Sequence, residues 1–299
     1  MSEISGVLNI NKPAGTTSAD YLAFIKKKLN LNKVGYAGTI DKFAQGVLPI
    51  LINKATKIAQ WVDGATKEYI AKIKFGINTD TNDITGNIIN EDKNFKLDIP
   101  EFLITLNSFI GEQMQVPPLF SAKKINGKRA SDLVRKGEKV ELKPEKITIF
   151  NIEVENINTE TNIAELKITC SKGTFIRALA RDIGEKLNTY ATVVELIRTK
   201  NGIFNIQESI DKQTIENTTS VSQLKVFSMN EVLNNFKELN IISSYKKLIL
   251  NGKFINKFYF HNYEDINSDG IYRIIDNNSN LIALIEYKNK KFHYLRVFK

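Results

Sequence analysis

The chain has 299 residues, of which 42% are hydrophobic and 25% charged, so it can bury a full core and is not compositionally disordered. Its 42 Lys and Arg residues outnumber 33 Asp and Glu, and the formal charge of +9 suits a polyanionic partner without proving one. A single cysteine, Cys170, excludes an internal disulfide, and both histidines, His261 and His293, lie near the C-terminal end, which excludes a Ser-His pair or an imidazole-bound metal elsewhere in the chain.

The usual glycine motifs for nucleotide phosphates, G-x-x-x-x-G-K-S/T and G-x-G-x-x-G, are missing from the sequence, which argues against ATP and NAD. The longest apolar run near the N-terminus, Val47 to Ile52, is far shorter than a membrane span, and no signal-peptide core precedes it. We therefore expect a soluble, cytoplasmic protein that binds no membrane and uses neither ATP nor NAD.

The predicted elements mix helices and strands. A helix is predicted from Ser18 to Leu29, because a Thr-Ser capping signal precedes it and three lysines favour its C-terminus. Alternating apolar and polar residues predict half-buried antiparallel strands over residues 69–75 and 164–170. Apolar residues spaced by four over residues 175–187 predict an amphipathic helix directly after the second strand. This order, without a regular βαβ rhythm, indicates an α+β sheet protein.

The composition changes near residue 240. Beyond it, three short β-rich runs, over residues 271–275, 281–287 and 292–298, are separated by turns rich in Asn, Asp and Lys. This pattern predicts a small β domain over residues 241–299, after a larger domain over residues 1–240.

Basic residues gather in three stretches, residues 1–60, 121–143 and 241–299, on an otherwise mildly acidic chain. This distribution favours a nucleic-acid surface over a uniformly basic one, although compositional drift toward lysine produces similar stretches. Nucleic acid is therefore the partner that the charge pattern favours.

Residues 34–59 form the most unusual stretch, V-G-Y-A-G-T-I-D-K-F-A-Q-G-V-L-P-I-L-I-N-K-A-T-K-I-A, in which three glycines surround a single carboxylate, Asp41. Taken alone, Asp41 is well explained as a turn residue that accepts hydrogen bonds from nearby amides. A role for it in a functional site depends on the rest of the chain.

This stretch resembles the Gly-His-Ala-Gly-Thr-Leu-Asp-Pro motif of the bacterial tRNA pseudouridine synthases of the TruB family. Further blocks resemble the same family in order and spacing, over roughly the first 210 residues. They are Gly6 to Pro13, Lys67-Glu68-Tyr69, Val116-Pro117-Pro118, Ser121-Ala122-Lys123, Cys170 to Arg177, and Leu196 to Thr199 followed by Gly202-Ile203-Phe204. Together these blocks are far more specific than any one motif, and the chain is identified as a member of the family.

The resemblance implies a pseudouridine synthase fold, with a mixed, mainly antiparallel central sheet and a small C-terminal PUA-like β domain that binds RNA. It implies isomerisation of uridine to pseudouridine at position 55 of the tRNA T loop, without a cofactor. Asp41 matches the family's catalytic aspartate, a nucleophile that attacks C6 of the base or C1′ of the sugar. Arg177 matches the arginine that keeps this carboxylate ionised; the alternative is a surface arginine near Arg181 with phosphate or no partner.

The resemblance also assigns residues around the base. Tyr69 matches a tyrosine that lies against the target base and helps to remove the C5 proton, whereas its periodicity alone predicts a core residue. Leu196 matches a position that contacts the base and is equally well explained as ordinary strand core. Lys12 matches a motif close to the substrate, where we expect it to shape the backbone rather than to react.

Three positions depart from the family pattern. Tyr36 stands where histidine is usual; the family residue stacks within the T loop when the base flips, and tyrosine can stack but cannot become cationic. Lys42 replaces the usual proline after the aspartate, which loosens the turn, and Phe175 replaces a common tyrosine.

The basic stretch over residues 120–143 matches the family's mobile RNA-binding insertion, the thumb, although a solvated lysine-rich helix is the alternative. Within it, we expect Lys123, Lys128 and Arg129 to contact RNA. The expected partner is tRNA, through its T arm and acceptor stem, and the chain is expected to be a monomer that needs no protein partner. Two other functions stay open: a tRNA-binding folding factor with secondary catalysis, and a pseudouridine synthase for another RNA.

Overall fold

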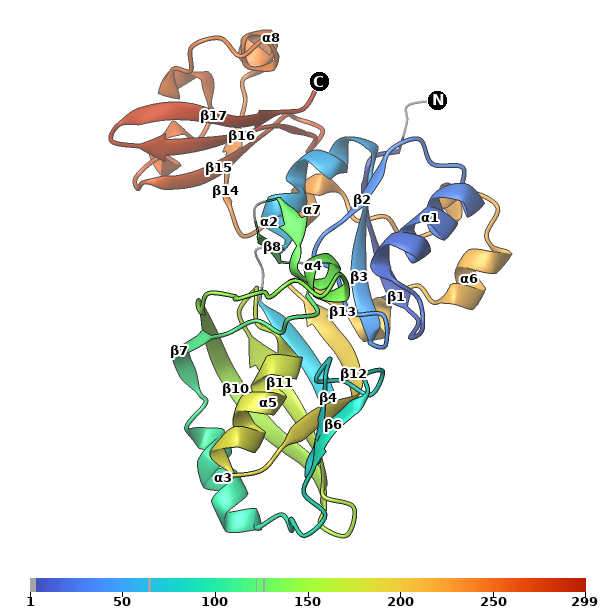
Figure 1. Ribbon diagram of the computed structural model, residues 1–299. Helices are drawn as coiled ribbons and strands as arrows, with labels where there is room; N and C mark the ends of the chain where they lie inside the picture. The colour runs from blue at the N-terminus through green and yellow to red at the C-terminus, as the bar shows by residue number, and fades with distance from the viewer. Residues whose placement is uncertain (1–3, 64–65, 122, 126) are drawn as a thin grey trace.

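The computed structural model of the chain describes residues 4–63, 66–121, 123–125 and 127–299. A long central sheet extends through the larger part of the chain, and a smaller sheet is built from its C-terminal end (Figure 1). The strands of the central sheet are, in spatial order, β1 (Gly6–Lys12), β3 (Gln45–Ile52), β12 (Ala191–Asn201), β4 (Lys67–Phe75), β11 (Ile163–Cys170), β10 (Glu145–Asn158) and β7 (Gly111–Gln115). In addition, β2 (Val34–Tyr36) pairs with β3 and β13 (Phe204–Asn205) pairs with β12.

The central sheet is mixed and mainly antiparallel, as the resemblance implies. Within the described ranges its pairings are antiparallel except that of β3 with β12, which is parallel. This parallel pairing joins the half of the sheet around β1 to the half around β4 and β11. It is short, with Ile197 opposite Gln45 and Arg198 opposite Gly46.

The two strands with clear alternation pair with each other. β11 runs antiparallel to β4, and Ile168 lies opposite Tyr69 in their register. Both strands bury alternate residues, because one face of the sheet is covered by α5 (Ile176–Lys186), which contributes Leu179 and Ile183 to the same core. The two predicted strands and the predicted helix after them are confirmed.

The first predicted helix is also confirmed as α1 (Ser18–Lys28), with Leu29 at its C-cap. The Thr17 side chain caps it by accepting a hydrogen bond from the Asp20 amide at 3.0 Å. In Figure 1, α1 and α6 (Lys212–Asn217) lie beside β1 and β3.

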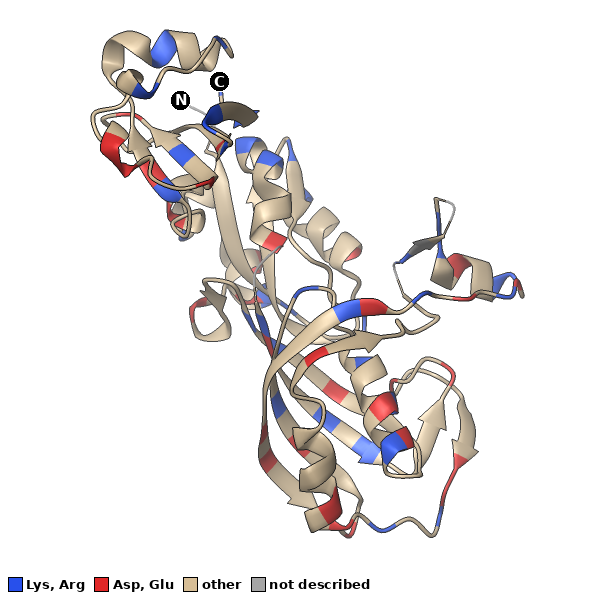
Figure 2. Cartoon of the chain, turned by 90° about the vertical axis from the view of Figure 1, so that its left-hand side faces the viewer, with Lys and Arg blue, Asp and Glu red and all other residues tan. Residues whose placement is uncertain are grey.

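Shorter elements connect these parts. They are α2 (Ala59–Asp63), α3 (Ile99–Asn107), α7 (Met229–Val232), β5 (Ile77–Thr79) and β6 (Ile88–Glu91). The predicted thumb contains β8 (Lys124–Ile125), β9 (Lys128–Arg129) and α4 (Ala130–Arg135), which project from the body of the molecule (Figure 2). In the described part of the chain, no helix is long and apolar enough to cross a membrane.

The C-terminal sheet has the order β14 (Lys237–Asn240), β15 (Gly270–Ile275), β16 (Leu281–Lys288) and β17 (Lys291–Val297), and α8 (Lys246–Leu250) packs near β16. The three β runs predicted there are confirmed. The sheet takes its first strand from residues 237–240, which precede the predicted second domain, and β14 runs parallel to β15. Division of the chain at residue 240 stays a prediction.

Candidate active site

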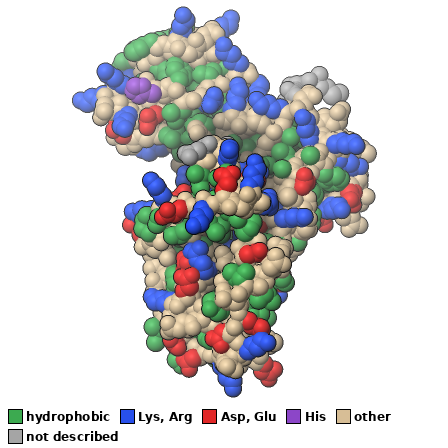
Figure 3. Space-filling model, viewed as in Figure 1, with side chains coloured by type: hydrophobic (Ala, Val, Ile, Leu, Met, Phe, Trp, Pro, Cys, Tyr) green, Lys and Arg blue, Asp and Glu red, His purple; other side chains and the backbone are tan. Residues whose placement is uncertain are grey.

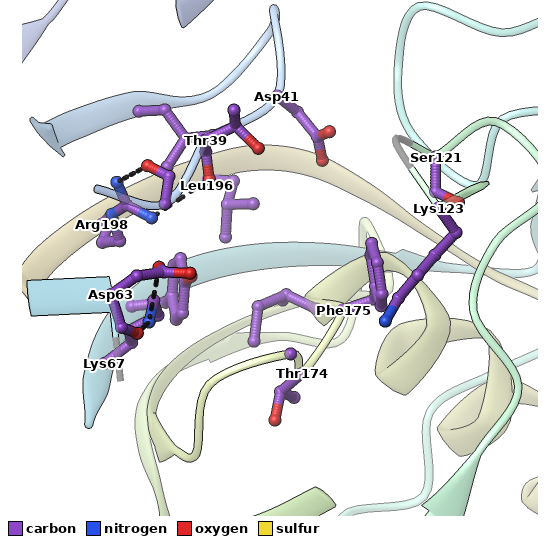
Figure 4. Close-up of a pocket in the computed structure, with 15 residues that line it drawn as sticks. Thr39, Asp41, Asp63, Lys67, Ser121, Lys123, Thr174, Phe175, Leu196 and Arg198 are labelled. Carbon is purple, nitrogen blue, oxygen red and sulfur yellow. Dashed lines mark hydrogen bonds and ion pairs between the residues drawn. The ribbon is translucent and has the colours of Figure 1, made fainter. Parts of the chain in front are cut away.

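A cavity of about 320 Å³ opens at the middle of the central sheet, beside the parallel joint between β3 and β12 (Figure 4). This volume falls within the roughly 300–1,000 Å³ typical of small-molecule sites. Its walls come from segments far apart in the sequence. They are residues 38–41, Asp63, Lys67, Tyr69, Ser121, Lys123, residues 173–176, Leu196 and Arg198.

Asp41 and Arg177 meet at this cavity. The Asp41 carboxylate accepts hydrogen bonds from Arg177 Nε at 2.8 Å and from Arg177 Nη2 at 3.0 Å, which is the bidentate geometry of a strong charge-assisted pair. The Arg177 side chain is only 4% exposed, whereas the Asp41 side chain is 38% exposed. The carboxylate is therefore fixed on one side and open on the other, and the alternative of a surface arginine at position 177 is wrong.

Three further contacts hold the Arg177 guanidinium. It donates to the Thr81 carbonyl at 2.9 Å and to the Phe120 carbonyl at 3.0 Å, and its Nη1 lies 3.3 Å from a carboxylate oxygen of the buried Asp83. Arg177 is the second residue of α5, so the start of this helix places the guanidinium within reach of Asp41, Thr81, Asp83 and Phe120. Such contacts prevent the arginine from leaving Asp41.

Tyr69 and Leu196 line the cavity from neighbouring strands, β4 and β12. Both side chains are largely buried, so each of these residues belongs to the core of the sheet and also lines the cavity. Burial raises the pKa of Tyr69 to about 12, while the positive charge of Arg198 opposes this rise. The Tyr69 hydroxyl is therefore protonated at neutral pH.

Lys12 is fully buried close to the cavity but does not line it. Its ammonium donates to the carbonyls of Pro13 and Thr16, each at 2.8 Å, and of Ala44 at 2.7 Å. Burial lowers its pKa to about 8, and the negative charge of Asp41 opposes this effect. Lys12 thus fixes the backbone on both sides of Asp41, as expected for a residue that shapes this region.

Of the other predicted RNA contacts, Lys123 lies at the cavity, whereas Tyr36, Lys128 and Arg129 do not. Lys123 lines it and forms an ion pair with Glu145, whereas Lys128 and Arg129 are exposed on the projecting thumb. Tyr36 is partly buried in β2, where it packs against the core beneath α1 rather than in the cavity wall.

Sequence reasoning missed four charged residues at or behind the cavity: Asp63, Lys67, Asp83 and Arg198. Lys67 donates to the Asp63 carbonyl at 2.9 Å and forms an ion pair of 3.5 Å with its carboxylate. The alternation of side chains along a strand could have identified Lys67 and Arg198. Lys67 lies two residues from Tyr69 and Arg198 lies two residues from Leu196, so each is expected on the same side of its strand as a predicted pocket residue. Asp83 gives no such signal.

Among the residues that the structure describes, no group of three or more His, Cys, Asp or Glu side chains is arranged to hold a metal ion. The cavity is lined by two carboxylates, that of Asp41, which Arg177 holds in place, and that of Asp63, together with aromatic, aliphatic and basic side chains. Chemically, this arrangement can supply a fixed anionic nucleophile beside an aromatic surface.

The fold and the site agree with comparisons to known proteins. A family model described as "TruB family pseudouridylate synthase (N terminal domain)" matches residues 26–176. A tRNA pseudouridine synthase B of Clostridium perfringens is 37% identical over 291 residues, which cover 97% of both chains. The same-named protein of Clostridium kluyveri is 39% identical over 99% of this chain and 100% of its own length.

A chain in the crystal structure of a Cbf5-Nop10-Gar1 complex superposes with a TM-score of 0.74 at 24% identity, covering 98% of this chain and 84% of that one. The fold and the site thus define a pseudouridine synthase. The chain belongs to the TruB family of pseudouridylate synthases.

Proposed function

We propose that this enzyme converts uridine to pseudouridine at position 55 in the T loop of tRNA. The observation that carries the proposal is the bidentate contact of Arg177 with Asp41, whose carboxylate faces a cavity lined by Tyr69 and Leu196. The choice of tRNA rests on the relatives at 36–41% identity, which are named tRNA pseudouridine synthase B. The bacterial relatives also support a cytoplasmic location.

Asp41 acts as the nucleophile. Two hydrogen bonds from the Arg177 guanidinium fix its carboxylate at the cavity, where the substrate base would lie. Attack at C6 or at C1′ gives the same overall balance. The bond between N1 and C1′ breaks, a bond between C5 and C1′ forms, the C5 proton is lost, and N1 gains a proton. No oxidant or reductant is consumed.

Tyr69 and Leu196 hold the flipped base. The aromatic ring gives a flat apolar surface for the uracil, and the aliphatic side chain closes the cavity on the neighbouring strand. Because Tyr69 lies against the base in this proposal and carries a titratable hydroxyl, it is the candidate to take part in removing the C5 proton. A base cannot reach the cavity from within a stack, so the target nucleotide leaves its stack first.

Basic residues of the thumb bind the RNA backbone. Lys123 lies at the cavity, and the exposed Lys128 and Arg129 extend the positive surface outward on the projecting hairpin (Figure 2). Contacts of this kind neutralise phosphates and make binding dependent on salt. Tyr36 is the aromatic residue proposed to stack when the base leaves the T loop.

The C-terminal unit is a PUA-like RNA-binding domain in this proposal. One of its faces carries a cavity of about 1,020 Å³ with lysines and aromatic rings together on its walls, and Figure 3 shows hydrophobic and basic side chains mixed on this end of the molecule. Phe254 is 81% exposed there, and Lys257 lies 5.0 Å from the ring centroid of Phe258. Exposed rings next to lysines are the features of a surface that stacks unpaired bases.

Turnover by an aspartate variant on a T-arm stem-loop tests the function. Asp41→Asn keeps nearly the same shape but cannot act as a nucleophile, so pseudouridine formation is expected to disappear while RNA binding remains. Asp182→Asn is a matched control, because Asp182 also accepts two hydrogen bonds from an arginine, Arg181, but lies outside the cavity.

The expected control result is turnover within about twofold of wild type. Substantial pseudouridine formation by Asp41→Asn, or an equal loss in both variants, contradicts the proposed role of Asp41. A wild-type enzyme that leaves the T-arm stem-loop unmodified contradicts the choice of substrate.

A further inference from the structure

Arg198 lies where the two halves of the central sheet join. On one side of β12 it is opposite Gly46 of β3, and on the other side it is opposite Tyr69 of β4. The residue is only 1% exposed. A guanidinium at this depth is costly unless its donors are satisfied, so the groups that accept from it define what it does.

Three hydrogen bonds of Arg198 go to backbone carbonyls on both sides of Asp41, and its side chain also interacts with that of Tyr69. Its Nε donates to the Val47 carbonyl at 2.7 Å. Its Nη2 donates to the Gly38 carbonyl at 3.0 Å and its Nη1 to the Thr39 carbonyl at 3.2 Å (Figure 4). One planar side chain thereby connects β12 to β3 and to the segment that leads to Asp41.

A second side chain of the same strand continues this contact. Asn201 donates to the Ala37 carbonyl at 3.2 Å, so β12 binds three consecutive carbonyls, at positions 37, 38 and 39. Ser18 of α1 exchanges hydrogen bonds of 3.1 Å with the amide and carbonyl of Ile40, the next residue. The backbone is therefore fixed at each position from 37 to 40.

Glycines make the close approach possible. Gly38 has a φ of +71°, and a Cβ built there lies 2.3 Å from Asp63 Oδ1 and 3.6 Å from Arg198 Nη1. Gly46 has a φ of +116°, and a Cβ there lies 2.2 Å from the Arg198 carbonyl oxygen. A side chain at position 46 would collide with the backbone of Arg198 and separate β3 from β12, whereas at position 38 it would collide with the side chain of Asp63. Both positions also have a positive φ that favours glycine, so the local sequence is adapted to this close packing.

We propose that Arg198 is a positioning residue, which holds the Gly38–Thr39 backbone against β12 and thereby keeps Asp41 where Arg177 can bind both of its carboxylate oxygens. The inference deepens the proposed function and rests on it for the role of Asp41. Leu196 lies two residues away on the same strand, and Tyr69 lies opposite on β4. The same contact therefore sets the nucleophile relative to the walls that hold the base.

Lysine cannot replace arginine in this role. A planar guanidinium donates in several fixed directions, whereas an ammonium is a compact charge that cannot bond at once to carbonyls on β3 and on the loop. Arg198→Lys keeps the positive charge and most of the apolar stem but loosens the loop. Small displacements of a reacting group cost roughly a hundredfold in rate when they approach 1 Å, so a clear loss in kcat is expected.

A purely structural arginine serves as the matched control. Arg273 of β15 is also largely buried and donates to the carbonyls of Phe236 at 3.0 Å and of Asn230 at 3.2 Å. It also pairs with Glu238 at 3.1 Å, and it does not line the active-site cavity. Arg273→Lys therefore perturbs a buried arginine of similar kind without touching the loop that carries Asp41.

The experiment compares the two variants by kcat and KM on a T-arm stem-loop, by thermal unfolding, and by amide hydrogen exchange. For Arg198→Lys we expect kcat to fall about tenfold or more with KM within about twofold, and amides of residues 37–44 to exchange faster while those of α1 do not. For Arg273→Lys we expect kcat and the exchange of residues 37–44 to stay as in wild type, even if its melting temperature falls by as much as that of Arg198→Lys.

The inference is overturned if Arg198→Lys keeps wild-type kcat, if residues 37–44 exchange normally in it, or if Arg273→Lys loses kcat equally. If Arg198→Lys does not fold, Arg198→Met replaces it, since it keeps an unbranched apolar stem and removes the buried charge. Failure of both to fold makes Arg198 a residue of the fold alone and also overturns the inference. Hydrogen exchange separates this outcome from failure of the proposed function, because it needs no turnover.

Discussion

Asp83 contacts Arg177 through Nη1, whereas Asp41 is bound by Nε and Nη2 of the same guanidinium. Its Oδ2 atom lies 3.3 Å from Arg177 Nη1, and both side chains are buried. The other carboxylate oxygen of Asp83 accepts hydrogen bonds from the Thr85 amide at 2.9 Å and the Thr81 hydroxyl at 3.0 Å, so its orientation is fixed. One guanidinium thus contacts two carboxyl groups, the buried one of Asp83 and that of Asp41, which faces the cavity.

Asp83→Asn tests this arrangement. The amide keeps the shape but removes the charge, so Arg177 loses one of its two anionic partners and holds Asp41 less firmly. We expect unfolding free energy to fall by about 1.5–3 kcal/mol, the range for hydrogen bonds to charged groups, and kcat to fall about tenfold. Urea unfolding and single-turnover rates on a T-arm stem-loop measure the two effects. A variant with normal kcat and reduced stability restricts Asp83 to a structural role.

Tyr69 variants separate the ring from the hydroxyl. Tyr69→Phe keeps the flat surface and is expected to slow turnover without weakening RNA binding, whereas Tyr69→Leu should also weaken binding of the flipped base. Because burial raises the pKa of Tyr69 to about 12, the ionised fraction grows as pH rises from 7 to 9. The wild-type single-turnover rate should therefore rise over this range, and that of Tyr69→Phe should not. A Tyr69→Phe variant as fast as wild type excludes a role for the hydroxyl, and equal binding by the two variants excludes a role for the ring.

Local patterns in the sequence were sufficient to predict much of the fold. Alternation over residues 69–75 and 164–170 predicts two strands, because each buries one face against the core. The start of α1 follows from a capping residue, Thr17, that acts over three positions. β14, over residues 237–240, was not predicted, since a four-residue strand with mixed polarity has no clear period and depends on its pairing with β15.

The active site follows less directly from the sequence. Asp41 and Arg177 are separated by 136 positions, so spacing cannot connect them, and only the family resemblance placed them together. Arg198 was missed because its donors bind backbone carbonyls. Every residue has such a carbonyl, so the sequence does not show which ones an arginine will bind. Its contacts depend on the parallel joint between β3 and β12, a long-range feature that no local period reveals.

The buried ammonium of Lys12 makes stability depend on pH. Burial lowers its pKa from 10.5 to about 8, so between these values the unfolded chain binds more protons than the folded chain. Unfolding free energy therefore rises with pH across this window and is lowest, for this group, below pH 8. Lys12→Met cannot titrate there. We expect the wild type to gain stability relative to Lys12→Met between pH 8 and pH 10 in chemical unfolding; a constant difference contradicts the lowered pKa.

Phe254 tests RNA binding by the C-terminal unit. Stacking of a base on an aromatic ring contributes roughly 1–3 kcal/mol, so Phe254→Ala should weaken binding of full-length tRNA about tenfold and leave a T-arm stem-loop unaffected. Phe150→Ala is the matched control, because Phe150 is also an exposed phenylalanine but lies on β10 of the central sheet. Filter binding at one salt concentration compares them. Equal affinities of wild type and Phe254→Ala for full-length tRNA exclude this surface.

The resemblance predicts a stacking role for Tyr36, which stands where the family usually has histidine. Base flipping costs a few kcal/mol, and an aromatic ring that stacks on the vacated space offsets part of that cost. If the ring face makes the contact, Tyr36→Phe and Tyr36→His should stay close to the wild-type single-turnover rate on a T-arm stem-loop, and Tyr36→Ala should lose far more, by about tenfold or above.

The folded state needs a separate control at this position, because the Tyr36 side chain packs against the core beneath α1. Thermal unfolding of Tyr36→Ala without RNA measures that contribution, and the rate comparison is made well below its melting temperature. An alanine variant as fast as wild type shows that Tyr36 only fills space in the core. A large defect in Tyr36→Phe alone instead shows that the hydroxyl, and not the ring face, contacts the RNA.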